Sequence, residues 1–278
     1  MTPPTAGPFR TRAELTGDLL RLGLGPGDAV LAHGALSRVG RMINGPDTLI
    51  GALLDVVSPG GTVLGYTDWA ADYDELLTPD GRVPDQWRAQ LAPFDPERSR
   101  AARANGALPE WLRCWPGARR SGNPGASVAA IGAGADWFTA DHPLDYGYGP
   151  GSPLARLVES GGKVAMIGAP WDTMTLLHHA EHLADLPAKR VINYEVPLII
   201  DGKLNWRLVR EYDTSDPVVA GLPDDYFGTI VGEFVAAGHG IRGSVGAADT
   251  LVVDAAAACA FAVRWLERTC GHRPNPAA

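Results

Sequence analysis

Three of the seven histidines lie within five residues of one another, in the segment Thr175–His182, and a carboxylate lies among them. His178 is followed by Glu181 three residues later and by His182 four residues later. In a helix this spacing places all three side chains on one face. A neutral imidazole held by a carboxylate can act as a general base, whereas two imidazoles and a carboxylate can bind a metal ion. The segment therefore predicts either proton transfer or a metal site.

The metal interpretation rests on the pattern H-x-x-E-H, which inverted zincins use with two histidine ligands and a glutamate base. It needs a third protein ligand, and Glu233 on a later predicted helix is the nearest candidate. In the interpretation without metal, His178 is the base and Glu181 or another carboxylate fixes its tautomer. In the plainest interpretation, the histidines only pack at a helix N-terminus. A histidine cluster just after a strand and a turn favours a functional site, because α/β proteins build sites there.

A second group of polar residues lies in residues 69–99, a connection long enough to be functional. Carboxylates pair with ammonium groups, and aromatic rings cover sugars or cations. If this segment lines a pocket, a polycationic ligand is expected; otherwise it is a solvated surface loop. The acidic and aromatic residues concerned are Asp68, Trp69, Tyr73, Asp74, Glu75, Asp80 and Asp85. Asp213, after a later predicted strand, could orient a histidine, bind a substrate amine or cap a turn.

The elements that must position these groups alternate between helix and strand. Thr11 with Glu14 forms a capping-box signature before a helix, and Asp201-Gly202 predicts the turn of a β-hairpin. This alternation predicts a layered α/β/α-type fold with a central mixed sheet and an inserted loop or helical region, as one domain over 1–278 with tails at 1–10 and 271–278. The predicted helices cover 11–24, 48–57, 104–115, 224–237 and 254–269. The predicted strands cover 28–32, 62–66, 127–132, 163–168, 191–201, 203–212 and 250–253.

Composition narrows the function classes. With 24 basic and 32 acidic residues the formal net charge is −8, which argues against nucleic-acid binding and suits a cationic ligand. Three cysteines without a CxxC argue against a disulfide framework or a cysteine zinc site, and Cys259 is expected in the core. Neither a membrane span nor a signal peptide is predicted, so the cytoplasm is the expected location. No G-x-G-x-x-G follows a strand, and the Walker A and G-x-S-x-G patterns are absent, which removes support for nucleotide hydrolysis and α/β-hydrolase chemistry.

Several segments together resemble the aminoglycoside 3-N-acetyltransferases of the antibiotic acetyltransferase superfamily. The resemblance spans roughly residues 12–268 and keeps the order of the family's segments. One motif alone would be weak, but the ordered set is specific. The segments are H-G-A-L-S-R-V-G at 33–40, G-P-D-T-L at 45–49, P-F-D-P at 93–96, P-G-A-R-R-S-G-N-P at 116–124, G-P-G-S-P at 149–153, T-L-L-H-H-A-E at 175–181, A-K-R at 188–190 and Tyr212-Asp213.

The resemblance implies acetyl-CoA-dependent acetylation of the 3-amino group of the 2-deoxystreptamine ring, without a metal, by direct transfer in a ternary complex of a monomer or homodimer. It implies antibiotic resistance as the biological role. The implied catalytic residues are His178, Glu181 and Asp213. The implied coenzyme residues are His33, Gly34, Ala35, Leu36, Val39, Arg120, Ser121 and Ser127. The implied substrate residues are Asp68, Trp69, Tyr73, Asp74, Glu75, Tyr146, His179 and Asp213.

The chain departs from the family pattern at two positions. Ala35 stands where the family usually has a serine, and the loss of one hydroxyl hydrogen bond typically costs about 0.5–1.5 kcal/mol. Asn123 stands where the family usually has a histidine, and an amide cannot act as a general base. Neither change touches His178. Three alternatives stay open: acetylation of another amine-bearing natural product, a zinc hydrolase using His178, Glu181 and His182, and a protein that sequesters cationic ligands without turnover.

Overall fold

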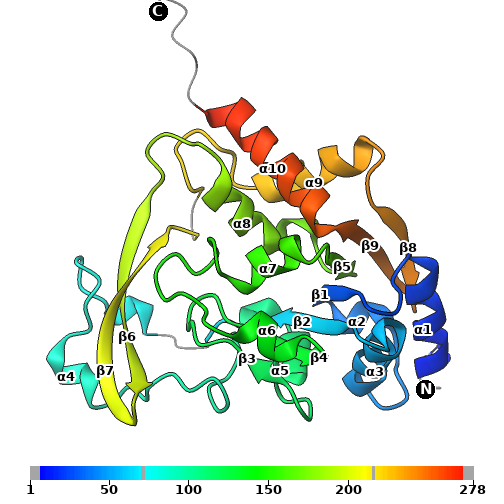
Figure 1. The fold of residues 1–278 in the computed structure, drawn as a ribbon, viewed down its shortest axis with the longest axis horizontal. Helices are drawn as coiled ribbons and strands as arrows, with labels where there is room; N and C mark the ends of the chain where they lie inside the picture. Colours follow the sequence, from blue (N-terminus) through cyan, green and yellow to red (C-terminus); the bar gives the residue numbers. More distant parts are fainter. Residues whose placement is uncertain (1–6, 70–72, 215–216, 272–278) are drawn as a thin grey trace, which may run out of the picture.

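A computed structural model describes residues 7–69, 73–214 and 217–271 of the chain. Its centre is a seven-stranded mixed sheet with the strand order β3-β4-β2-β1-β5-β9-β8 (Figure 1). Two further strands, β6 and β7, form a separate sheet. The strands are β1 (Ala29–Gly34), β2 (Thr62–Tyr66), β3 (Arg119–Arg120), β4 (Val128–Gly132), β5 (Lys163–Ile167), β6 (Val191–Ile200), β7 (Lys203–Tyr212), β8 (Ile241–Val245) and β9 (Ala248–Asp254).

The three central strands run parallel, with β1 between β2 and β5. Val30 of β1 is in register with Val63 of β2 and with Lys163 of β5. The carboxyl ends of these strands, at residues 34, 66 and 167, therefore lie at one edge of the sheet, while β4 and β9 join on either side as antiparallel strands. Open α/β sheets bind ligands beyond the carboxyl ends of their parallel strands, so this edge is the place to look for the site.

Helices cover both faces of the sheet, because successive residues of a strand point to opposite sides. Val30 and Ala32 pack with one helical layer, and Leu31 between them packs with the other. The predicted α/β/α layering around a mixed sheet is confirmed. One layer holds α1 (Arg12–Arg21), α2 (Leu36–Val39), α3 (Pro46–Val57) and α5 (Leu108–Arg113). The other holds α6 (Ala135–Thr139), α7 (Pro153–Glu159), α8 (Leu176–Leu183), α9 (Tyr226–Ala236) and α10 (Ala255–Cys270).

Two local predictions from sequence are confirmed. In the capping box before α1, the Thr11 hydroxyl accepts a hydrogen bond from the Glu14 amide, and the Glu14 carboxylate accepts one from the Thr11 amide at 2.8 Å. Cys259 on α10 is buried in the core. Within the described residues, no helix is both long and apolar enough to cross a bilayer.

The predicted inserted region consists of the segment after β2 together with the β6–β7 hairpin, which Figure 1 shows as a yellow arc beside α4 (Asp85–Arg88) at one end of the molecule. Glu195 on β6 accepts hydrogen bonds from Arg88 (2.6 Å) and from the Val83 amide (3.0 Å). The hairpin turns at Asp201 and Gly202, which have φ of 51° and 72°, as the sequence predicts. The region has a small core of its own, built from Tyr73, Val83, Phe94, Val196, Leu198 and Val209.

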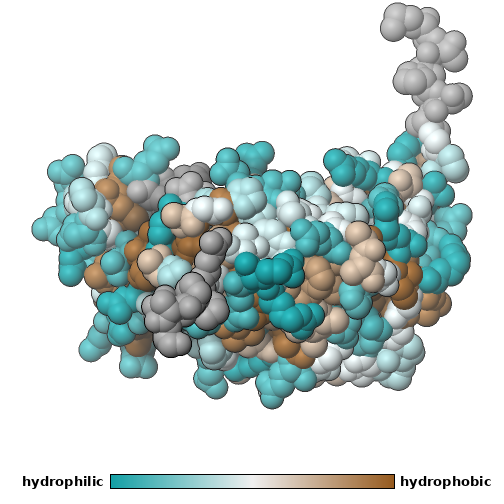
Figure 2. All heavy atoms as spheres, turned by 90° about the horizontal axis from the view of Figure 1, so that it is seen from above, coloured by the Kyte–Doolittle hydropathy of each residue, from teal (hydrophilic) through white to brown (hydrophobic). Residues whose placement is uncertain are grey.

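Hydrophobic residues also reach the surface at the hairpin end of the molecule, among hydrophilic neighbours (Figure 2). On the hairpin, Ile199 and Leu204 are exposed cross-strand partners. The apolar surface of the hairpin is therefore divided between the small core beneath it and an outer face.

Several predicted boundaries are wrong. The helix expected at 104–115 is divided into the 3₁₀ helix Arg103–Asn105 and α5, because Gly106 between them has a φ of 80° that interrupts the helix. The strand expected at 250–253 is longer and pairs with β8, which was not predicted. Of the expected tails, residues 1–6 and 272–278 lie outside the described part of the chain, whereas the amide of Arg10 donates to the Arg41 carbonyl at 2.6 Å.

A buried histidine connects the sheet to the loop before α7. His142 is 8% exposed. Its Nδ1 lies 2.8 Å from the Ser121 hydroxyl, and its Nε2 lies 2.6 Å from the Gly147 carbonyl. Because the carbonyl can only accept, Nε2 carries a hydrogen and Nδ1 accepts from the serine. Burial lowers the pKa of His142 to about 4, so the ring is neutral at physiological pH.

This shift predicts acid lability. The unfolded chain takes up a proton at His142 as the pH falls through about 6.5, and the folded chain does so only near 4, so the free energy of unfolding falls between these values. At pH 5 the loss from this residue is about 2 kcal/mol. The variant His142→Gln lacks this loss. If wild type is more stable than the variant at pH 7, its advantage in free energy of unfolding should therefore be about 2 kcal/mol smaller at pH 5. Urea unfolding at both pH values measures it, and an unchanged difference would contradict the assignment.

Candidate active site

Helix α8 presents the histidine cluster at the carboxyl edge of the sheet. Leu176, Leu177 and Ala180 are buried in the core and fix the rotation of the helix. The His178 side chain keeps 21% of its surface exposed, whereas that of Glu181 keeps 2%. The His178 side chain therefore stays accessible to solvent, whereas its partner Glu181 is buried beneath it.

His178 and Glu181 form a close pair. Nδ1 of His178 lies 2.7 Å from Oε2 of Glu181, and the Tyr226 hydroxyl donates a hydrogen bond to Oε1 of the same carboxylate. Burial and the neighbouring carboxylate raise the pKa of Tyr226 well above its ordinary value, so this hydroxyl keeps its proton. Because a carboxylate only accepts, Nδ1 carries the hydrogen and Nε2 offers a lone pair. The pair has the geometry of a base held in one tautomer.

Aromatic rings enclose the imidazole of His178. The centroid of the His178 ring lies 4.8 Å from that of the Tyr148 ring and 4.9 Å from that of the Phe227 ring. These rings come from the loop before α7 and from α9, so segments far apart in sequence build the pocket around the base. They restrict the ring to a narrow range of orientations and exclude water from part of its surface.

His182 has a different partner. Its Nε2 lies 3.0 Å from Oε1 of Glu211 on β7, but the direction is not that of an aligned hydrogen bond, so the contact is electrostatic. The other oxygen of Glu211 accepts a hydrogen bond from the Gly147 amide at 2.6 Å. Both side chains are buried. The third histidine of the cluster, His182, thus connects α8 to the hairpin.

The metal interpretation is not supported by this geometry. Glu233, the expected third ligand, lies on the outer part of α9, where its side chain is half exposed and pairs with Arg268 at 3.4 Å. His182 faces Glu211 instead. In the described ranges, no group of three His, Cys, Asp or Glu side chains is arranged to hold a metal ion.

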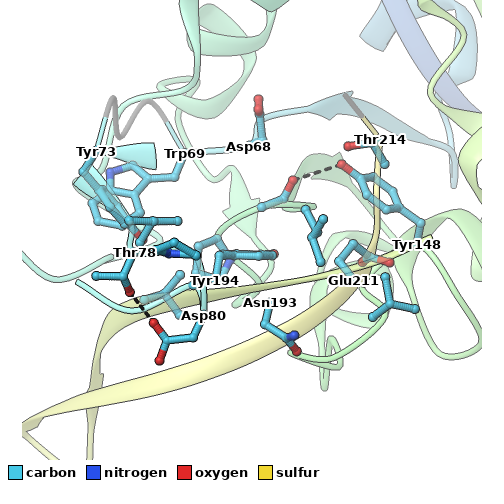
Figure 3. A pocket seen from close by; sticks show the side chains of 18 of the residues that line it. Asp68, Trp69, Tyr73, Thr78, Asp80, Tyr148, Asn193, Tyr194, Glu211 and Thr214 are labelled. Atoms are coloured by element: carbon cyan, nitrogen blue, oxygen red, sulfur yellow. Dashed lines mark hydrogen bonds between the residues drawn. The ribbon is translucent and has the colours of Figure 1, made fainter. Parts of the chain in front are cut away.

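A cavity of about 680 Å³ opens between the loop after β2, the turn at 124–125 and the β6–β7 hairpin. Figure 3 shows Trp69 and Tyr73 at one end and Tyr148 and Glu211 at the other, with Asp68 on one side between them. We call it the acidic cavity, because three carboxylate residues line it: Asp68, Asp80 and Glu211. Its aromatic residues are Tyr66, Trp69, Tyr73, Tyr148 and Tyr194.

A second cavity, of about 280 Å³, lies at the end of β1, and we call it the glycine cavity. Its walls include residues 32–35, residues 104–106 and the segment after β5. At Gly34 a Cβ would lie 2.6 Å from the Leu108 side chain, so a larger residue would require Leu108 to shift. Tyr66 lines both this cavity and the acidic cavity. The two cavities therefore meet at the end of β2.

A third cavity, of about 440 Å³, continues from the glycine cavity, since residues 169 and 170 line both. Its polar wall carries Arg38 of α2 and Asp249 of β9. One guanidinium nitrogen of Arg38 donates to the Gly168 carbonyl at 2.8 Å. We call it the arginine cavity. The three cavities follow one another along the carboxyl edge of the sheet.

Of the predicted coenzyme residues between positions 33 and 39, three line a cavity and two pack with the core. His33, Gly34 and Ala35 line the glycine cavity, and the buried Nε2 of His33 has no protein hydrogen-bond partner. Burial lowers the pKa of His33 to about 4, so its ring is neutral. The assignment of Val39 and Leu36 needs correction. Val39 is fully buried in the core, and Leu36 packs against that core, because α2 turns both side chains away from the cavity.

Arg120, Ser121 and Ser127 form an internal hydrogen-bond network, and their predicted role in coenzyme binding stays a prediction. The Arg120 guanidinium donates to the Ser127 hydroxyl at 3.0 Å and to the Thr67 carbonyl, and Ser127 donates to the same carbonyl at 2.7 Å. The Ser121 hydroxyl contacts His142 and the Val128 amide. Among the described residues, none of the three lines the acidic, glycine or arginine cavity. Their hydrogen bonds hold the end of β2 in place.

The predicted substrate residues also separate. Asp68, Trp69 and Tyr73 line the acidic cavity. Glu75 is exposed outside it, and the side chain of Asp74 lies outside the described part of the structure. The sequence pattern could not distinguish these residues, because only the fold of the loop decides which of its side chains turn inward.

Tyr146, His179 and Asp213 have other partners. Tyr146 packs against the rings of His182 and Tyr212. His179 is a correction: it is buried, and its Nδ1 lies 2.7 Å from the Tyr148 carbonyl, so it holds the loop and has no surface for a substrate. Asp213 follows β7, lies 3.5 Å from Arg190 and precedes Thr214, which lines the acidic cavity.

Sequence reasoning missed Tyr66, Tyr148 and Glu211. Tyr66 ends a predicted strand, a position where sites are built, so a signal for it was present. Glu211 is recognisable only once the hairpin is placed.

Asn123 has a structural role. It is buried, its amide nitrogen donates to the Pro143 carbonyl at 2.7 Å, and its amide oxygen accepts from the Ala126 amide at 2.9 Å.

Comparison with known proteins identifies the family. A sequence profile described as aminoglycoside 3-N-acetyltransferase matches residues 31–267. The chain is 46% identical over 273 residues to aminoglycoside N(3)-acetyltransferase VII of Streptomyces paromomycinus, covering 96% of this chain and 94% of that protein. The chain belongs to the aminoglycoside 3-N-acetyltransferase family. It is also 44% identical to aminoglycoside N(3)-acetyltransferase III of Pseudomonas aeruginosa, over 94% of this chain and 95% of that one.

Solved structures of this family have the same fold. AAC-IIIb, solved as a binary complex with CoASH, superposes with a TM-score of 0.94 at 60% identity, covering 96% of this chain and all of that chain. AAC-VIa bound to sisomicin superposes with a TM-score of 0.91 at 34% identity, covering 95% and 100%. The resemblance inferred from the ordered motifs is thereby confirmed, and the chain is a transferase of this family.

Proposed function

We propose that this enzyme transfers the acetyl group of acetyl-CoA to the 3-amino group of the 2-deoxystreptamine ring of aminoglycosides, and so confers resistance to them. The observation that carries the proposal is the junction of two unlike cavities at Tyr66. One is acidic and large, the other is smaller and has no carboxylate among the described residues that line it, and the ring of Tyr148 connects the junction to the His178–Glu181 pair.

The acidic cavity suits an aminoglycoside. Its carboxylates can pair with ammonium groups, and its aromatic side chains offer faces to sugar rings and cations. Glu211 is buried and carries the negative charge into the end of the cavity beside Tyr148. We assign Asp213 to substrate orientation at the rim beside Thr214, because Glu181 already holds His178. Several charge pairs at fixed positions would place one chosen amine at the junction.

The glycine cavity suits the pantetheine arm of acetyl-CoA, and the arginine cavity suits its phosphates. A narrow passage lined by residues 32–35 admits an extended chain, and the neutral His33 offers a buried ring nitrogen to an amide of that chain. At the far end, the Arg38 guanidinium supplies a positive charge beside the third cavity. AAC-IIIb binds CoASH, which supports this assignment.

Direct transfer accounts for the chemistry. The unprotonated amine bonds to the acetyl carbon while His178 takes the proton that the nitrogen loses, and Glu181 stabilises the imidazolium that results. As the carbon–sulfur bond breaks, the sulfur leaves as a thiolate and takes up that proton from His178, so the products are a neutral amide and a free thiol. An acyl-cysteine route lacks support: among the described residues no cysteine lines any of the three cavities, and burial raises the pKa of Cys259 to about 11.

The test is release of free thiol from acetyl-CoA in the presence of an aminoglycoside, with the acetylated nitrogen located by NMR. We expect thiol release to depend on the aminoglycoside and the acetyl group to lie on N3. Release only with an unrelated amine would favour acetylation of another natural product. Tight aminoglycoside binding without thiol release would favour a sequestering protein, and loss of activity on exhaustive chelation would revive the metal interpretation.

A further inference from the structure

Tyr66 lies where the acidic cavity and the glycine cavity adjoin. Of the residues that line the acidic cavity or the glycine cavity in the described structure, it alone lines both. It is the last residue of β2, and the next residue, Thr67, is fixed on both sides of its peptide by the network of Arg120 and Ser127. The Tyr66 side chain is thus held rigidly at the point where an amine from one cavity would meet a carbonyl from the other.

The Tyr66 hydroxyl belongs to a group of three oxygen atoms. It lies 2.6 Å from the Tyr148 hydroxyl and 2.9 Å from the Gly125 carbonyl oxygen, and the Tyr148 hydroxyl lies 3.0 Å from the same carbonyl. Two protons serve these three contacts. One hydroxyl donates to the carbonyl and the other donates to its neighbour, so either tyrosine alone is able to satisfy Gly125.

This arrangement makes one proton available without cost to the backbone. If Tyr148 donates to Gly125, the proton of Tyr66 is free to turn toward a new acceptor, and no buried carbonyl loses its partner. Burial and the neighbouring hydroxyl raise the pKa of Tyr66 well above its ordinary value, so it remains a donor at neutral pH. Tyr148 itself lines only the acidic cavity, whereas Tyr66 also lines the glycine cavity, so Tyr66 is the one of these two tyrosines that contacts both.

We propose that Tyr66 is a catalytic residue whose hydroxyl donates a hydrogen bond to the thioester carbonyl oxygen as negative charge develops there. The inference rests on the proposed function and names the group that stabilises its transition state. As the substrate nitrogen bonds to the acetyl carbon, the carbonyl electron pair moves onto oxygen and is held by the Tyr66 hydrogen bond. The pair returns as the carbon–sulfur bond breaks, the sulfur leaves with its electron pair, and Tyr66 keeps its proton throughout.

The first test is Tyr66→Phe, which keeps the ring and leaves Tyr148 to satisfy Gly125. We expect kcat to fall by about 10²-fold, as for other single oxyanion donors. Because the donated bond strengthens only in the transition state, the Kd values of CoA and acetyl-CoA, measured by calorimetry, should change by less than about threefold. A kcat within about threefold of wild type would overturn the inference, and so would a loss confined to the KM of the aminoglycoside.

Two further variants separate donation from packing. Incorporation of 3,5-difluorotyrosine at position 66 gives a stronger donor of nearly the same shape, and we expect kcat to be kept or raised at a pH where the phenol is protonated. Tyr148→Phe leaves the Tyr66 proton shared between Gly125 and the substrate, and we expect a smaller loss than for Tyr66→Phe. A larger loss in Tyr148→Phe, or a fluorinated protein as slow as the phenylalanine variant, would contradict the assignment. A wild-type protein that releases no thiol would instead count against the proposed function.

Discussion

Replacement of His178 by glutamine is expected to lower kcat by about 10³-fold, within the range that general base catalysis contributes. The physical reason is the tautomer. Glu181 and Nδ1 are 2.7 Å apart, so the imidazole offers its Nε2 lone pair to the substrate, and a glutamine side chain offers no basic nitrogen. The Kd values of both substrates should stay near wild type. Within the described structure, the His178 ring contacts the protein side chains of Tyr148, Phe227 and Glu181, and the variant changes no residue that lines the three cavities.

The matched control is His239→Gln. This exposed histidine stacks on Phe234 at the end of α9, far along the chain from α8 and outside the residues that line the three cavities. Its replacement should leave kcat unchanged. Circular dichroism and thermal unfolding verify that His178→Gln is folded, and a folded variant that turns over at a near wild-type rate would exclude His178 as the base.

The sequence could predict the layers of the fold because each layer has a local signature. The buried strands of β1, β2 and β5 read as short apolar runs bounded by glycine or proline, and the alternation of Val30, Leu31 and Ala32 between the two faces follows from strand geometry alone. β8 was missed because Ile241–Val245 is short, contains a glycine and lies at the edge of the sheet, so it lacks the apolar run on which such predictions depend.

The site was predictable only where its partners are close in sequence. His178 and Glu181 are one helical turn apart, so their contact follows from the spacing. Glu211 on the hairpin and Tyr148 in the loop before α7 contact the histidines of α8 from distant parts of the sequence, and no local sequence pattern predicts such contacts. Conversely, Arg120 and Ser127 belong to conspicuous motifs but act inside the protein, where they fix the end of β2. The motif therefore identified a segment close to the cavities, but it could not tell a residue that contacts a ligand from one that holds the backbone of β2 in place.

Substitution of Glu181 by glutamine should lower kcat by about 10²-fold while the histidine itself is retained. The glutamine has the shape of the glutamate and can still accept the hydrogen of Nδ1, but it has no charge. The buried carboxylate stabilises the imidazolium that forms when His178 takes the substrate proton, and in low dielectric surroundings that stabilisation is large. A neutral partner therefore slows the step in which positive charge appears on the ring.

A matched variant distinguishes this electrostatic role from simple orientation. Tyr226→Phe is the matched variant, because it removes the hydroxyl that donates to Glu181 but leaves the charge in place. We expect it to cost less than about tenfold in kcat. If the two variants lost equal activity, the carboxylate would act by position alone, and the charge on Glu181 would have no part in the proton transfer.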